Sequence, residues 1–140
     1  SAAVSSGPQL LKGSGLILVA DDEEAIRLTA RMMLEKCGYE VLTAVNGADA
    51  VKIYAEHGAQ IKLVVLDLLM PGMSGEAAAM ELRKINPDVK ILLASGMIHD
   101  ERADRLASDD KCIFMQKPYT FEALSRAVHD LDNYIKNQPH

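Results

Sequence analysis

The sequence predicts a doubly wound α/β domain, in which a five-stranded parallel sheet carries helices on both faces. Short runs of Val, Ile and Leu alternate with longer amphipathic stretches, which is the pattern of successive βαβ units. Two of the runs, Leu63–Leu66 and Ile91–Ala94, are apolar at every position, so both faces of those strands must be covered. The length of 140 residues suits one domain with one core.

The apolar runs and the polar residues that close them locate the strands. We expect strands at Leu16–Ala20, Glu40–Ala44, Leu63–Asp67, Val89–Ala94 and Cys112–Gln116. Residues 1–15 contain Ser, Gly, Pro and Ala without a sustained period, so we expect a linker or flexible extension there. The folded domain is therefore expected over residues 16–136, and residues 137–140 are expected to fray.

Apolar residues at helical spacing predict the helices between these strands. A shorter helix is expected between Ile98 and Ala107, where charged residues are frequent. Thr120 is placed to cap the last helix, and Gly38 and Gly58 are placed to end the first two in the left-handed conformation. The four apolar stripes are Ile26, Ala30, Met33 and Cys37; Ala48, Val51 and Ala55; Ala78, Leu82 and Ile85; and Phe121, Leu124, Val128, Leu131 and Ile135.

The composition excludes several classes of function. Acidic residues outnumber basic ones by 20 to 15, so direct nucleic-acid binding is not expected. The apolar runs are far shorter than the roughly 18 residues of a membrane span, which predicts a soluble, cytoplasmic domain without membrane contact. Cys37 and Cys112 lack C-x-x-C spacing and are expected to be buried, reduced thiols rather than a disulfide or a zinc site.

Polar side chains close four of the five expected strands. Asp21 and Asp22 follow the first strand, Asp67 ends the third, Ser95 follows the fourth and Lys117 follows the fifth. Ligands of open parallel sheets bind beyond the carboxyl ends of the strands, so we expect these side chains to converge. Asp22 alone is equally consistent with a cap of the next helix, but capping does not explain the whole set.

The converging residues suggest a chemistry. Three carboxylates at one place repel one another unless a cation lies between them. Ligation by oxygen alone selects a hard ion, and Mg²⁺ in particular combines carboxylates with waters and a phosphate oxygen. Lys117 would add a point charge and Ser95 a hydroxyl donor, which together suit a bound phosphoryl group.

Four segments carry these residues in order: Ile17–Glu23 (ILVADDE), Val64–Gly75 (VVLDLLMPGMSG), Leu93–Gly96 (LASG) and Phe114–Pro118 (FMQKP). In this combination they resemble the receiver domains of two-component response regulators over most of the chain. The resemblance implies a flavodoxin-like strand order of 2-1-3-4-5. It also implies a signalling switch rather than an enzyme, one that promotes only its own aspartyl phosphorylation and dephosphorylation.

The resemblance implies a role for each residue of the set. Asp67 would accept a phosphoryl group from a phosphohistidine of a sensor histidine kinase or a histidine phosphotransfer domain. Lys117 would pair with that phosphoryl group. Mg²⁺, or Mn²⁺ in its place, would be held by Asp21, Asp22, Asp67 and the backbone carbonyl of Leu69.

Ser95 and Phe114 occupy the two switch positions of the family. After phosphorylation Ser95 would move toward a phosphoryl oxygen, and Phe114 would turn into the vacated space. The surface of the fourth helix, fifth strand and fifth helix would then change, and a homodimer, if one forms, would use it. Phe114 is equally consistent with a plain core aromatic. The Lys117–Pro118 peptide bond is expected to be cis.

Some features leave alternatives open. Leu69 and Met97 are apolar where the family often has polar side chains, which leaves room for a pseudo-receiver that acts only as an interaction module. We also interpret these two residues as slowing self-dephosphorylation. A small enzyme or flavin carrier on a similar sheet is disfavoured, because Asp21 and Asp22 stand where a glycine-rich phosphate loop would be needed.

The origin of the domain is a finer question. The steps Ser95–Met97 and Gln116–Tyr119, together with the linker ahead, resemble receivers at the C-terminus of hybrid sensor histidine kinases. In that case the parent chain would be a histidine kinase, and this cytoplasmic domain would be tethered to a membrane sensor kinase. A stand-alone regulator and a receiver that feeds a phosphotransfer domain are the other two readings, since the residues after Lys136 are too few for an output domain.

Overall fold

The computed structural model describes residues 12–97, 100–106 and 111–134. Strands and helices alternate along this part of the chain, as predicted, and the first, second and fifth strands have the expected bounds. The third strand begins earlier than expected, and the fourth begins later and includes Ser95. The elements are β1 Leu16–Ala20, α1 Glu24–Lys36, β2 Glu40–Ala44, α2 Gly47–His57, β3 Ile61–Asp67, α3 Gly75–Ile85, β4 Ile91–Ser95, α4 Glu101–Leu106, β5 Cys112–Gln116 and α5 Phe121–Tyr134.

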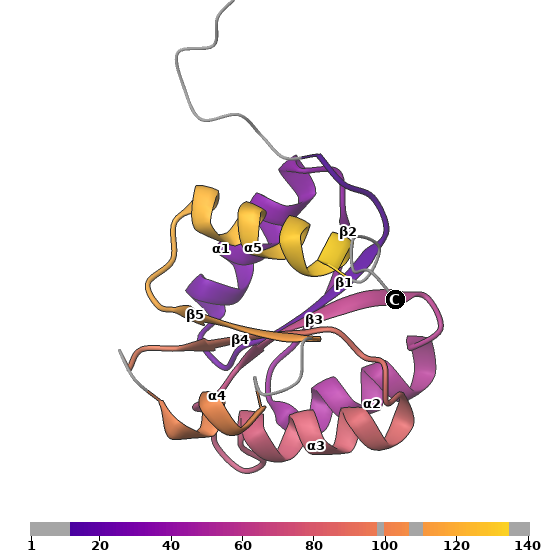
Figure 1. The fold of residues 1–140 in the computed structure, drawn as a ribbon, viewed down its shortest axis with the longest axis vertical. Helices are drawn as coiled ribbons and strands as arrows, with labels where there is room; N and C mark the ends of the chain where they lie inside the picture. The colour runs from indigo at the N-terminus through magenta and orange to yellow at the C-terminus, as the bar shows by residue number, and fades with distance from the viewer. Residues whose placement is uncertain (1–11, 98–99, 107–110, 135–140) are drawn as a thin grey trace, which may run out of the picture.

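The strands form one parallel sheet in the order β2-β1-β3-β4-β5, which confirms the predicted flavodoxin-like fold. Helices α1 and α5 cover one face of the sheet, and α2, α3 and α4 cover the other (Figure 1). The direction of winding reverses between β1 and β3. Loops diverge at that point, so the carboxyl ends of these two strands border the natural binding crevice of the fold.

The inner strands contribute to two cores at once. Leu66 of β3 packs in the cluster beneath α2, α3 and α4, whereas its neighbour Val65 packs in the cluster beneath α1 and α5. Leu93 and Leu92 of β4 divide in the same way. Because successive side chains of a strand point to opposite faces, a strand covered on both sides is apolar throughout. This explains the unbroken apolar runs of the sequence.

The predicted buried faces of α2 and α3 are partly wrong. Ala48 and Ala55 are exposed, and the buried residues of α2 are Gly47, Ala50 and Tyr54. In α3, Ile85 is exposed. Tyr54 sets the orientation of α2, because its ring is fully buried and its hydroxyl accepts a hydrogen bond from Asn86 Nδ2 at 3.0 Å. Alanine fits either face of a helix, so the alanine spacing did not reveal this face.

The helix ends follow the predictions with one exception. Gly38 has the left-handed φ of +105° after α1, and Thr120 Oγ1 accepts the N–H of Ala123 at 3.0 Å at the start of α5. Gly58 is not left-handed: its φ is −52°. A Cβ there would lie 2.6 Å from the carbonyl oxygen of Tyr54, so close packing explains this glycine. The predicted contact residue Ile135 lies outside the described residues.

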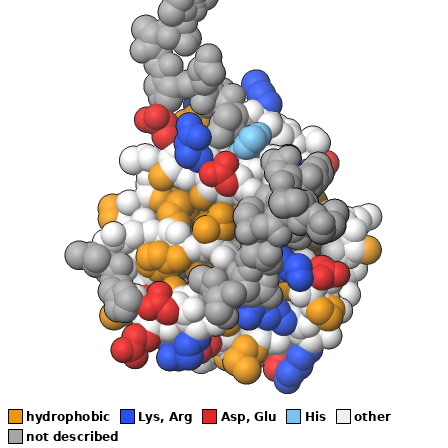
Figure 2. All heavy atoms as spheres, in the orientation of Figure 1, with side chains coloured by type: hydrophobic (Ala, Val, Ile, Leu, Met, Phe, Trp, Pro, Cys, Tyr) orange, Lys and Arg blue, Asp and Glu red, His pale blue; other side chains and the backbone are white. Residues whose placement is uncertain are grey.

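The surface and the thiols agree with the composition. Charged side chains of both signs are interspersed with separate groups of hydrophobic side chains on the face shown in Figure 2. None of the helices in the described ranges is long and apolar enough to cross a membrane. Cys37 and Cys112 are buried, as predicted, and are not joined by a disulfide; burial raises the pKa of the Cys37 thiol.

Candidate functional site

The carboxyl ends of β1 and β3 bring three carboxylates together. Asp21, Asp22 and Asp67 each offer an oxygen within 4.8 Å of the others. The register explains this, because Ala20 pairs with Leu66 and the next residue of each strand is an aspartate. Asp21 and Asp67 are both 3 % exposed, whereas Asp22 is exposed to solvent. The cluster therefore has a buried base and an open side.

Asp22 does not cap the helix that follows it. The residue before α1 is Glu23, whose side chain makes no capping hydrogen bond, and the backbone N–H of Glu23 donates to Asp21 Oδ1 at 2.9 Å. The capping interpretation of Asp22 is therefore wrong. Its carboxylate remains directed to the cluster instead.

Lys117 reaches the cluster from the end of β5. Its Nζ lies 3.2 Å from Asp21 Oδ2 and 3.4 Å from Asp67 Oδ2. Burial alone would lower the pKa of Lys117, but the two carboxylates outweigh burial and raise it, so the amine stays charged. The backbone N–H of Lys117 donates to the carbonyl of Ser95 at 2.7 Å, and the Lys117–Pro118 peptide bond is cis.

The pKa of Asp67 lies above the ordinary value of an aspartate. Burial and the charge of Asp21 raise its pKa to about 6, although Lys117 and the N–H of Leu69, which donates to Asp67 Oδ1 at 3.4 Å, act in the opposite direction. A divalent cation would relieve the repulsion that raises this pKa. The donor set consists of oxygens only, so it fits Mg²⁺.

A cleft of about 350 Å³ opens above Asp67. Leu69, Lys117 and Pro118 line it together with Gly96. The side chain of Leu69 is 73 % exposed, so an apolar group stands at the rim of the site. The cleft is wide enough to admit a small anion or the side chain of a partner to Asp67.

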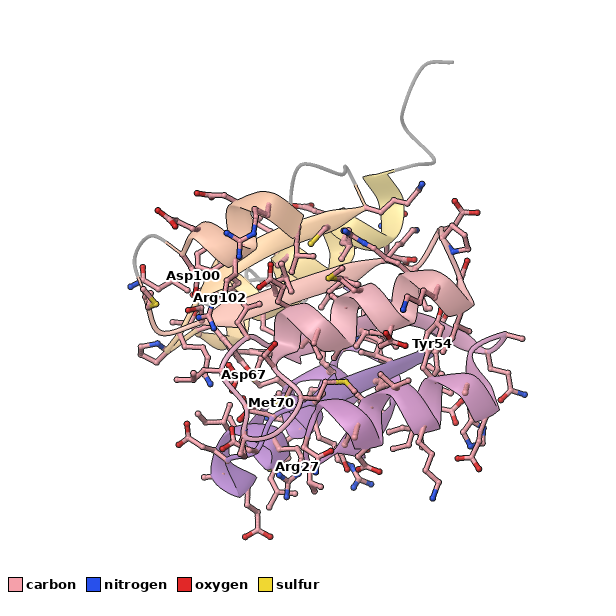
Figure 3. The ribbon with its side chains drawn as sticks, turned by 90° about the horizontal axis from the view of Figure 1, so that it is seen from below. Arg27, Tyr54, Asp67, Met70, Asp100 and Arg102 are labelled. Atoms are coloured by element: carbon pink, nitrogen blue, oxygen red, sulfur yellow. The ribbon has the colours of Figure 1, made fainter. Side chains whose placement is uncertain are left out.

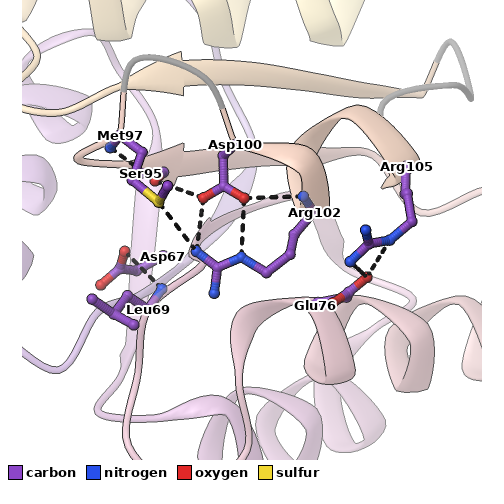
Figure 4. A network of polar contacts seen from close by, with 8 residues as sticks. All are labelled: Asp67, Leu69, Glu76, Ser95, Met97, Asp100, Arg102 and Arg105. Atoms are coloured by element: carbon purple, nitrogen blue, oxygen red, sulfur yellow. Dashed lines mark hydrogen bonds and ion pairs between the residues drawn. The ribbon is translucent and has the colours of Figure 1, made fainter.

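Ser95 lies at the same sheet edge but its hydroxyl faces the start of α4. It donates to Asp100 Oδ2 at 2.9 Å, and Oγ accepts the N–H of Met97 at 3.1 Å (Figure 4). Asp100 is also bound by Arg102, and in Figure 3 both residues lie at the same end of the domain as Asp67, far from Tyr54. The sequence reasoning missed Asp100 and Arg102. The D-x-R spacing at the start of the charged fourth helix was the available signal.

Phe114 is half-buried on β5 and packs against the cluster beneath α2, α3 and α4. This is the side of the sheet on which α4 lies (Figure 1). The position is consistent with both interpretations of this residue, the core aromatic and the switch.

The fold and the acidic cluster define a receiver domain of two-component signalling. Residues 17–129 match the family described as the response regulator receiver domain, so the chain belongs to that family. It is 36 % identical over 121 residues to the sensor kinase CckA of Brucella abortus, an alignment that covers 86 % of this chain and 13 % of the kinase. It is 32 % identical to the chemotaxis protein CheY of Bacillus subtilis, covering 81 % of this chain and 93 % of CheY.

A solved structure shows the same architecture. The response regulator TrrA of Thermotoga maritima, solved in complex with Mg²⁺ and BeF, is 36 % identical and superimposes with a TM-score of 0.74. The match covers 84 % of this chain and 98 % of that protein. The chain thus spans nearly all of a receiver domain but only a small part of the Brucella kinase.

Proposed function

We propose that this chain is a phosphoaccepting signalling switch in which Asp67 takes a phosphoryl group from a phosphohistidine of a sensor histidine kinase or a histidine phosphotransfer domain. One observation carries the proposal: Asp67 is held 3.4 Å from Lys117, beside Asp21 and Asp22, at the open edge of a receiver fold. An ion pair that served only stability would not need a third carboxylate, Asp22, beside the two that contact Lys117.

The chemistry is nucleophilic attack by a carboxylate. An oxygen of Asp67 forms a bond to phosphorus while the bond from phosphorus to the donor imidazole nitrogen breaks, which yields an acyl phosphate and a free histidine. Lys117 supplies positive charge to the transferred group. Asp21, Asp22, Asp67 and the backbone carbonyl of Leu69 would hold Mg²⁺ or Mn²⁺, whose charge offsets that of the phosphoryl oxygens.

The conformational change after phosphorylation would depend on Ser95 and Phe114. Ser95 would exchange its present acceptor for a phosphoryl oxygen, and Phe114 would turn toward the space it leaves. The surface of α4, β5 and α5 would then shift, and a homodimer, if one forms, would use that surface. The proposed switch unit extends over residues 16–136. Most of the expected linker, residues 1–15, and all of the expected frayed end, residues 137–140, lie outside the described residues.

The likeness to the Brucella kinase supports a receiver of a hybrid histidine kinase. The domain would then be cytoplasmic, a location that is consistent with two buried cysteines that form no disulfide. The alternative origin is a stand-alone regulator.

The mass of the intact protein tests the proposal. The protein is incubated with Mg²⁺ and acetyl phosphate beside Asp67→Ala and, as a matched control, Asp130→Ala on the exposed side of α5. We expect one added phosphoryl group that requires Mg²⁺, is absent in Asp67→Ala and persists in Asp130→Ala. No added mass in the wild type would instead support the pseudo-receiver, a module that only binds partners.

A further inference from the structure

Ser95 has a single hydroxyl proton, and the structure shows its acceptor. The side chain is 2 % exposed, and its hydroxyl donates to Asp100 Oδ2 at 2.9 Å while accepting the N–H of Met97. A hydroxyl donates one hydrogen bond. Ser95 in this orientation is therefore unable to donate to a phosphoryl oxygen on Asp67.

Asp100 is a strong acceptor for that proton. It is buried directly before α4, and Arg102 donates to it through Nε at 3.0 Å, Nη2 at 2.7 Å and the backbone N–H at 3.0 Å (Figure 4). The side-chain bonds of Arg102, then the bond from Ser95, hold the pKa of Asp100 well below its usual value despite burial. A charged acceptor binds a hydroxyl more tightly than a neutral one.

Arg102 also makes release of Ser95 feasible. If the hydroxyl leaves, Asp100 keeps the three hydrogen bonds from Arg102, so no buried charge is left without a partner. The guanidinium lies close enough to Asp67 for that carboxylate to add to the larger effects of Asp100 and Glu76 that raise the pKa of Arg102. Negative charge gained by Asp67 would therefore act on the same guanidinium.

We infer that Asp100 and Arg102 form a latch that holds Ser95 in the resting orientation and opposes activation of the switch. The inference rests on the proposed function and deepens it, since it names two positioning residues that set how readily a phosphorylated Asp67 captures Ser95. On phosphorylation the hydroxyl exchanges one anionic acceptor, Asp100, for another, the phosphoryl oxygen, without transfer of a proton. The exchange breaks the link between Ser95 and the start of α4.

Beryllofluoride with Mg²⁺ is the probe for this latch, because it mimics the phosphoryl group without a donor protein. Fluorine NMR gives the concentration at half-saturation for the wild type and Asp100→Asn, an isosteric variant with a neutral and weaker acceptor. We expect the beryllofluoride concentration at half-saturation to be about fivefold lower for Asp100→Asn than for the wild type. This factor corresponds to the difference between a charged and a neutral hydrogen bond. Glu101→Gln removes the same charge from an exposed neighbour and is expected to match the wild type.

A double variant separates the latch from a simple charge effect. Loss of the buried charge of Asp100 would by itself favour an anion at Asp67, so Asp100→Asn is repeated in a Ser95→Ala background. A latch acts through Ser95, so the effect of Asp100→Asn is expected to vanish there. A fivefold effect that persists without the Ser95 hydroxyl overturns the latch. The lost charge of Asp100 would then act directly on the bound anion.

The remaining outcomes separate the latch from the function on which it rests. Equal half-saturation in the wild type and Asp100→Asn overturns the latch and leaves the proposed function intact. A wild type that binds no beryllofluoride overturns both. Should circular dichroism show that Asp100→Asn is unfolded, Asp100→Ser, whose shorter side chain lies out of reach of Ser95, takes its place with the same expectations.

Discussion

Lys117 Nζ lies 3.4 Å from an Oδ atom of Asp67, although fifty residues of chain, two strands and two helices separate the two positions. The contact exists because β5 and β3 both end at the same edge of one parallel sheet. The pair is nearly buried, with side-chain exposures of 12 % for Lys117 and 4 % for Asp67. Its charges therefore interact strongly, and changes to either residue are expected to be measurable.

Replacement of Asp67 by Asn is expected to stabilise the metal-free protein at pH 7.5. The pKa of Asp67 is raised to about 6 in the folded state, so its contribution to stability is present below the unfolded pKa of 3.8 and is lost as the pH rises through 6. Asn is neutral at every pH, so the variant avoids this loss of stability. We expect its free energy of unfolding at pH 7.5 to exceed that of the wild type by about 1 to 2 kcal/mol, after allowance for the weakened contact to Lys117.

Urea unfolding in EDTA at pH 7.5 and pH 5 measures this effect. The advantage of Asp67→Asn is expected to shrink at pH 5, where Asp67 of the wild type is mostly protonated. Glu122→Gln, at the exposed start of α5, is the control and should show no such change with pH. An advantage that is constant across this range would contradict the raised pKa.

Replacement of Lys117 by Met is expected to destabilise the metal-free protein by about 3 kcal/mol, because Asp21 and Asp67 lose their shared cation while buried. Added Mg²⁺ should restore part of this loss, since the ion supplies positive charge to the same carboxylates. Thermal unfolding with and without Mg²⁺ gives both quantities. A loss that Mg²⁺ leaves unchanged would argue against a metal site at this cluster.

The combined substitution of Leu69 by Asn and Met97 by Glu is expected to shorten the lifetime of the phosphorylated protein. Both side chains are exposed, at 73 % and 54 %. The resemblance to receiver domains implies that these two positions flank the route of a hydrolytic water. Polar groups there would orient that water, and about 1.4 kcal/mol of such assistance corresponds to a tenfold shorter half-life. The half-life is measured from the loss of the added phosphoryl mass with time. An unchanged half-life would contradict the hypothesis that Leu69 and Met97 slow dephosphorylation.

Replacement of Gly75 by Ala is expected to destabilise the fold by about 3 kcal/mol through overpacking. A Cβ at this position would collide with the carbonyl oxygen of Asp67 and would lie 2.5 Å from Leu68 Cα, so α3 could not start where it does. Gly96→Ala is the matched control, because a Cβ added there would meet no atom of the described residues within 4 Å beyond its chain neighbours. Equal urea midpoints for the two variants would show that α3 moves without cost.

Much of the site was predictable from the sequence. Asp21, Asp67 and Lys117 each follow a run of apolar residues, and a parallel sheet aligns the carboxyl ends of all its strands. The side-chain type and the strand end together determine where such a residue lies, so their convergence needed no knowledge of packing. The strands themselves were equally clear, because strands covered on both faces leave little room for polar residues.

The tertiary structure decided what depends on packing between elements. Tyr54 determines which face of α2 is buried, and its carbonyl excludes a side chain at Gly58. Asp100 and Arg102 determine the orientation of Ser95. The sequence by itself determined the strands, the acidic cluster and its lysine, since these follow from the period and from strand ends. The rotation of a helix and the acceptor of a hydroxyl depend on side chains that meet only when the chain is folded, and only the tertiary structure revealed them.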